Sequence, residues 1–203
     1  MKVRFDFKSE KGMAFLESLL YKVGGKYNYM ALLKLAFFAD RYHIRNYARP
    51  VSGDVYYAMK LGPVPSALKD IIDIQTFYGE DIISTSQYDI KLKSENIDAD
   101  QLSQSDIEAI DFAVKEFGVI GKSHYAIANL THAYPEWDKY KEKFVNNSNS
   151  REDMDYLDFL QNAKPNHEEF RKLQFRDPFI PLTETERQDL TDEIKEVAQL
   201  YNA

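Results

Sequence analysis

Residues 34–68 have the sequence KLAFFADRYHIRNYARPVSGDVYYAMKLGPVPSAL, and this stretch predicts a helix, a turn, a strand and a second helix in succession. The apolar run that ends at Ala39 belongs to a helix over 29–47, whose first half should be buried and whose second half should be amphipathic. Arg49–Asp54 contains a proline and a glycine and therefore predicts a turn. Residues 55–59 favour a strand, and 61–65 favour a tight connection into a helix over 66–78 that ends at Gly79.

The flanking sequence predicts further helices and one β-hairpin. Helical periodicity with start and stop signals indicates a helix capped by Ser9 and ended by Gly24, a helix with a Ser105–Glu108 capping box, and a helix that begins after Ser123. Three more are expected: a short helix begun by Pro135, a helix around 154–160 ended by Pro165, and an acidic helix capped by Thr183 and Glu186. The alternation over 82–92 is typical of a hairpin. The predicted fold class is α+β, predominantly helical: a helical core with a small antiparallel β-sheet from residues near 55–60 and 81–93.

Composition indicates an ordinary globular protein. The chain has 203 residues, 44% hydrophobic and 29% charged. We expect a main domain over 1–145 and a helical extension over 146–203, packed on the same domain, with the polar residues 146–150 as a linker. The sequence has no cysteine, which excludes disulfides, thiolate-bound zinc and a cysteine nucleophile and fits the cytoplasm. The N-terminus lacks the apolar region of a secretory signal, and Lys34 and Asp40 interrupt the best candidate for a membrane span.

The charge distribution favours a protein partner over nucleic acid. The formal net charge is -7 and the pI is about 5.2, and such a chain repels a phosphate backbone. The charge is uneven, because residues 29–60 are rich in lysine and arginine whereas residues 95–116 are rich in acids. This asymmetry suits an oriented contact with another protein.

Several motifs resemble those of the Panacea domain, a SocA-like antitoxin family found in bacterial and phage toxin–antitoxin operons. They are Phe38-Ala39-Asp40-Arg41, His43, Arg49-Pro50, Gly53-Asp54, Tyr57-Ala58 and Gly62-Pro63-Val64-Pro65-Ser66, followed by Leu130-Thr131-His132, Pro135 and Trp137. The similarity covers about residues 29–140. One departure is Ala48, where a glycine commonly precedes the Arg-Pro pair. The resemblance implies a binding scaffold without catalysis, cofactor or metal, which neutralises a co-encoded protein toxin by direct contact.

One set of residues has the composition of a protein interface, in which arginine and aromatic side chains supply anchors and methionine adapts to varied shapes. The candidate partner-binding residues are Arg41, Arg45, Arg49, Tyr56, Tyr57, Met59 and Lys60. The alternative is a solvated basic face beside core tyrosines.

A second set is expected to be structural. Asp40 should accept hydrogen bonds from Arg49 or a nearby backbone amide, and His43 should fill a half-buried slot. Gly62, Pro63 and Pro65 should form a rigid elbow rather than a phosphate loop, because the two prolines lack amide donors. Trp137 should fold back onto the core. The remaining members of this structural set are Asp54 and His132.

Other functions stay open at this point. The chain could be an adaptor that delivers a bound client to a cellular protease, with residues 146–203 as the tether. A metal-dependent hydrolase would use Asp40, His43, Asp54 and His132, although no local metal-ligand motif is present. Operator-DNA binding would need Arg41, Arg45 and Arg49 on one helix face. A homodimer is compatible with any of these functions.

Overall fold

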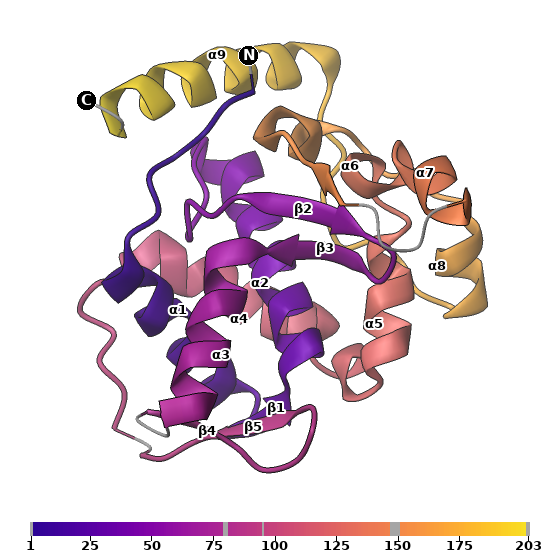
Figure 1. The fold of residues 1–203 in the computed structure, drawn as a ribbon. Coiled ribbons are helices and arrows are strands. Elements are labelled where there is room, and N and C mark those ends of the chain that lie inside the picture. Colours follow the sequence, from indigo (N-terminus) through magenta and orange to yellow (C-terminus); the bar gives the residue numbers. More distant parts are fainter. Residues whose placement is uncertain (1, 79–80, 95, 147–150, 202–203) are drawn as a thin grey trace.

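The computed structural model describes residues 2–78, 81–94, 96–146 and 151–201. Its architecture is α+β and predominantly helical, as predicted. Helix α2 (Tyr29–Tyr47) runs through the centre and contacts α1 (Ser9–Lys22), α4 (Gln104–Phe117) and α5 (His124–Thr131), while α3 (Ser66–Tyr78) packs on α1 (Figure 1). The core therefore forms around the apolar run that the sequence places at 31–39.

Helix α2 is more deeply buried than its sequence predicts. Every residue from Ala31 to Arg41 is buried, and so are His43, Ile44 and Arg45. The expected amphipathic second half is narrower than predicted: Asn46 and Tyr47 are exposed, but Arg41, His43 and Arg45 are covered by later parts of the chain. The helix ends at Ala48, which has φ 52° in the left-handed region that favours glycine. A glycine would adopt this conformation without strain.

Most helix boundaries agree with the sequence, but two caps do not. Ser103 and Asp106 form the capping box of α4, instead of Ser105 and Glu108, and Ser9 is the first residue of α1 instead of its cap. Because Ser105 is not the cap, its hydroxyl can contact His43 and Arg49. The predicted starts at Ser123, Pro135 and Thr183 are confirmed in α5, α6 (Pro135–Asp138) and α9 (Glu184–Tyr201).

The strands form two antiparallel sheets. In one, β2 (Tyr56–Met59) lies between β3 (Gly62–Pro65) and β6 (Glu152–Asp153); in the other, β5 (Asp89–Leu92) lies between β1 (Lys26–Asn28) and β4 (Ile82–Ser84). The hairpin over 82–92 is confirmed, but it does not pair with residues near 55–60. Residues 62–65 are a strand as well as the connection into α3. Two prolines are tolerated in β3 because it is an edge strand.

Several short elements follow α4. These are the 3₁₀ helix η1 (Ile120–Lys122), α7 (Lys141–Asn146), the 3₁₀ helix η2 (Tyr156–Leu160) and α8 (Glu168–Lys172). The α-helix expected around 154–160 is instead the 3₁₀ helix η2, which follows strand β6 and contacts α2, α6 and α9. Gly79 and residues 147–150, four of the five residues of the expected linker, lie outside the described residues. Within the described residues, no helix combines the length and apolarity that crossing a membrane requires.

Candidate functional site

Asp40 holds the turn that follows α2. Its carboxylate accepts hydrogen bonds from the backbone amides of Val51 at 2.7 Å and Ser52 at 3.0 Å, from the Ser52 hydroxyl, and from the Tyr56 hydroxyl at 2.8 Å. Burial raises the pKa of Asp40, and these donors counteract the shift. Asp40 and Tyr56 are therefore parts of the fold, since both are buried and each satisfies the other.

Asp54 performs a similar task for α3. Its two carboxylate oxygens accept hydrogen bonds from the amides of Ala67 at 2.9 Å and Leu68 at 2.8 Å, in the first turn of that helix. A carboxylate at a helix N-terminus satisfies free amides and interacts favourably with the helix dipole. Burial raises the pKa of Asp54 to about 6. This residue caps a helix and is not exposed to a reactant.

His43 joins α2 to the start of α4. One ring nitrogen lies 2.6 Å from the carbonyl oxygen of Arg49, and the other lies 3.0 Å from the Ser105 hydroxyl and 3.3 Å from Asp106. Burial lowers the pKa of His43 to about 4, so the ring is neutral at pH 7. Arg49 reinforces the junction with a hydrogen bond of 3.1 Å to Asp106. The slot is fully buried instead of half-buried.

These contacts separate the residues of the hydrolase hypothesis. Asp40 faces the 51–56 turn and His43 faces α4, while His132 stacks on Trp137 with ring centroids 3.6 Å apart. Asp40, His43 and His132 thus contact three different parts of the structure and do not converge on one site. In the part of the chain that the structure describes, no three metal-ligating side chains gather in one place.

Arg41 and Arg45 are buried in a cluster that we call the arginine clamp: these two residues, Glu136 and the segments 159–162 and 176–181. Arg41 has no exposed surface; it forms an ion pair with Glu136 and donates to the Gln161 carbonyl at 2.7 Å. Its guanidinium lies 4.7 Å from the centre of the Tyr134 ring. Burial raises the pKa of Glu136, while the Arg41 charge opposes that shift.

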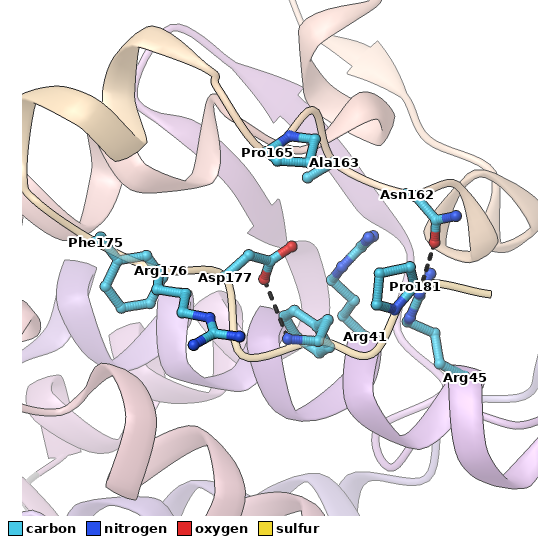
Figure 2. A pocket seen from close by; sticks show the side chains of 10 residues that line it. Arg41, Arg45, Asn162, Ala163, Pro165, Phe175, Arg176, Asp177 and Pro181 are labelled. Atoms are coloured by element: carbon cyan, nitrogen blue, oxygen red, sulfur yellow. Dashed lines mark hydrogen bonds between the residues drawn. The ribbon is translucent and has the colours of Figure 1, made fainter.

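Arg45 completes the clamp with neutral acceptors. It donates to the carbonyls of Leu160 at 2.9 Å and Ile180 at 2.8 Å, and to the Asn162 side chain at 3.0 Å. Burial and the neighbouring Arg41 charge lower the pKa of Arg45 to about 9. Figure 2 shows both arginines beside the chain segment that runs from Phe175 to Pro181. Residues of this segment and the two arginines line a pocket of about 460 Å³.

The clamp corrects the predicted partner contacts. Arg41 and Arg45 fasten two C-terminal segments to α2, so their guanidinium groups contact acceptors of the chain itself. Arg49 is mostly covered by the start of α4, and Tyr56 is buried. Half-buried Tyr57 lies under the Arg151 guanidinium at 4.8 Å. Of the seven candidates, only Met59 and Lys60 are exposed.

The turn between β2 and β3 presents Met59 and Lys60 from a fixed position. The Trp137 indole donates to the Met59 carbonyl at 2.8 Å, and the Lys34 ammonium donates to the Pro63 carbonyl at 2.6 Å. Gly62 has φ 91°, and a Cβ there would lie 2.3 Å from the Thr131 hydroxyl. Gly62 is thus required twice, by its backbone conformation and by its close approach to α5. Pro63 and Pro65 stiffen the same strand, in keeping with a rigid elbow.

A groove of about 390 Å³ runs beside this turn, and we call it the hairpin groove. It is lined by Tyr29, Met30, Leu33 and Lys34 of α2, by Met59, Lys60, Leu61 and Val64 of the hairpin, and by Lys69 of α3. Met59 is 37% exposed and Leu61 38%, whereas Lys34 is 3% exposed. The groove thus combines exposed apolar side chains with a buried ammonium.

Sequence reasoning missed most of this groove. The pattern predicts Tyr29, Met30 and Leu33 as part of a buried helix, and Leu61 as part of a connection. Lys34 stands out in the sequence as an interruption of an apolar run and as one cation of the basic stretch 29–60. That interruption was the available signal, since a lysine is almost never buried without a reason.

Comparison with known proteins identifies the family. The family model for the SocA-like antitoxin, Panacea domain, matches residues 32–138, which is more than half of the chain. The chain belongs to this family. No curated protein and no solved structure matches the chain significantly.

The Panacea domain contains nearly all of the hairpin groove but only part of the arginine clamp. All residues of the hairpin groove except Tyr29 and Met30 lie within the matched range, as do Thr131 and Trp137, which fix the hairpin. The arginine clamp draws its carbonyl acceptors from residues 159–162 and 180, beyond the match. A binding surface carried by the Panacea domain itself is therefore better sought at the groove.

Proposed function

We propose that this chain is a cytoplasmic antitoxin of bacterial or phage origin that neutralises a co-encoded protein toxin by direct binding, and that the toxin contacts the hairpin groove. Membership of the SocA-like antitoxin family supports the antitoxin role. The groove supports the location, because it lies largely within the Panacea domain and exposes apolar side chains that a monomer gains nothing by exposing.

The observation that carries the proposal is the rigid presentation of Met59 and Leu61. Met59 directly precedes a two-residue turn and Leu61 is its second residue, and the strands on both sides are anchored by the Trp137 and Lys34 hydrogen bonds. A surface that is already ordered loses little conformational entropy when a partner binds. Apolar residues on such a surface are the usual energetic centre of a protein interface.

The direct test is co-expression of the chain with the product of the neighbouring reading frame. Rescue of growth together with copurification of the two proteins would support neutralisation by binding. Met59→Asp and Leu61→Asp should each abolish rescue, because they place a charge where an apolar contact is expected. Val119→Asp is the matched control, since Val119 is 74% exposed and does not line the groove.

The outcomes separate this proposal from its alternatives. If the neighbour is harmless and does not copurify, the antitoxin proposal is wrong. If the groove variants and the control rescue growth equally, the chain is an antitoxin that uses another surface. If rescue depends on a fall in the amount of toxin, measured after synthesis is stopped, the chain acts as an adaptor for a protease.

A further inference from the structure

Lys34 is buried under conditions that do not favour an ammonium group. The Pro63 carbonyl is its neutral acceptor at 2.6 Å, and no carboxylate among the described residues forms an ion pair with it. An ammonium has three donors and a full charge, so this environment leaves it incompletely compensated. Burial lowers the pKa of Lys34 to about 7.

The two arginines on the same side of α2 differ from Lys34 in their hydrogen-bond and ion-pair partners. Arg41 has the Glu136 carboxylate, and Arg45 has several carbonyl oxygens in addition to the Asn162 side chain. The fold thus supplies partners to the buried cations that serve its own stability. Lys34 instead lines a groove that opens to solvent.

We infer that the hairpin groove binds an apolar segment of a partner protein that carries a carboxylate, and that this carboxylate pairs with Lys34. The inference rests on the proposed function and adds the chemistry of the ligand. The apolar part of the segment would contact Met30, Leu33, Met59 and Leu61. Lys60, at the exposed turn, adds a second positive charge that suits an acidic segment.

Several charged groups surround Lys34 and must be considered in any pH-dependent measurement. Lys60 of the turn and Lys69 of α3 line the groove, and Lys69 is paired with Asp73 at 2.6 Å. The Tyr29 hydroxyl belongs to the start of α2. His132, after α5, has its pKa lowered to about 3 by burial and by the Lys34 charge, so it remains neutral above pH 5. Lys34 is therefore the group near the groove whose charge changes around pH 7.

The test uses a simple probe in place of the toxin. Octanoate has an apolar tail and a carboxylate, while octanamide has the same tail without the charge. The full chain, labelled at the methionine methyl groups, is titrated with each compound and followed by NMR. Met30 and Met59 line the groove, whereas Met13 and Met154 do not and serve as internal controls.

Octanoate should shift the Met30 and Met59 signals at concentrations at least tenfold lower than octanamide does. The preference should disappear in Lys34→Leu. In the wild type, the affinity for octanoate should fall roughly tenfold between pH 6 and pH 8, because the fraction of a group with pKa 7 that is protonated falls by that factor. Leu61→Asp, which leaves Lys34 in place but adds a competing carboxylate at the rim, should also weaken binding.

The inference is overturned if neither compound shifts the two groove signals, if octanamide binds as well as octanoate, or if Lys34→Leu keeps the preference. These outcomes do not depend on the toxin. A carboxylate preference without any toxin interaction would refute the proposed function and leave the groove chemistry standing. Toxin binding without a carboxylate preference would support the proposed function and refute the groove chemistry.

Discussion

The arginine clamp and the hairpin groove both use cations of one helix, but they differ in what surrounds the charge. Lys34, Arg41 and Arg45 are spaced i, i+7 and i+11 on α2, so they lie on one side of it. Arg41 and Arg45 are enclosed by acceptors from the C-terminal segments, whereas Lys34 has one carbonyl and an apolar groove. A buried charge with internal partners thus has a structural role, and the shortage of such partners at Lys34 is what supports the proposed ligand site.

The largest effect is expected in the clamp. Arg41→Met leaves the Glu136 carboxylate buried without its cation, which should lower the free energy of unfolding by about 3 to 5 kcal/mol. The double variant Arg41→Met with Glu136→Met should recover much of the loss. Urea unfolding of the four proteins in this cycle measures both values. Strictly additive effects would mean that the two side chains do not stabilise each other.

The hairpin turn should be nearly as sensitive. Gly62→Ala imposes a strained left-handed residue and a contact of 2.3 Å with the Thr131 hydroxyl, so a loss of at least about 2 kcal/mol is expected. Gly24→Ala is the matched control, because Gly24 has φ 100° but its Cβ would meet nothing within 4 Å. It should cost about 1 kcal/mol from the backbone alone. Thermal unfolding of both variants gives the difference, and equal losses would show that the hairpin is not tightly held against α5.

Replacing Lys34 should change the free energy of unfolding in the opposite direction to replacing Arg41. Lys34→Leu should stabilise the free protein at pH 6 by about 1 to 3 kcal/mol, because it removes a poorly compensated buried charge. The pKa of Lys34 is lowered from 10.5 to about 7, so the unfolded chain binds the proton more tightly. The wild type should therefore gain stability as the pH rises from 7 toward 10, and the variant should lack that gain. Urea unfolding at pH 6, 7, 8 and 9 tests the difference, and a destabilised variant would contradict it.

The smallest effect concerns the exposed cation beside the groove. Lys60→Gln should leave the free energy of unfolding unchanged within about 0.5 kcal/mol, since the side chain is at the surface. It should mainly slow association with an acidic partner, and this slowing should weaken at high salt. Stopped-flow or surface-based kinetics with the toxin would measure the change. A large stability loss would mean that Lys60 belongs to the fold, as the arginines do.

The sequence predicts the parts of this molecule that local patterns determine. Helix α2, the start of α5 at Ser123, the α9 capping box and the 82–92 hairpin follow from periodicity and from side chains within a few residues. The sequence offers two capping boxes of equal spacing, Ser105 with Glu108 and Ser103 with Asp106, and the structure uses the second. Local rules could not choose between the two frames.

The candidate site was harder to predict because its decisive contacts are distant in sequence. Arg41 and Arg45 resemble interface residues until the carbonyls of Gln161 and Ile180, more than 100 positions away, are brought to them. The strand β6, which pairs with β2, is only two residues long and carries little pattern of its own. Met59 and Lys60 are exposed because they stand at the turn between β2 and β3, and the sequence predicts only a connection where β3 forms.

Amide hydrogen exchange of the chain, alone and in complex with the product of the neighbouring reading frame, would locate the partner-binding surface. We expect new protection at residues 57–64 and 29–34, which form the hairpin groove, and little change at 159–162 and 176–181, which form the clamp. Protection confined to the clamp segments or to α9, with the groove unchanged, would contradict this expectation.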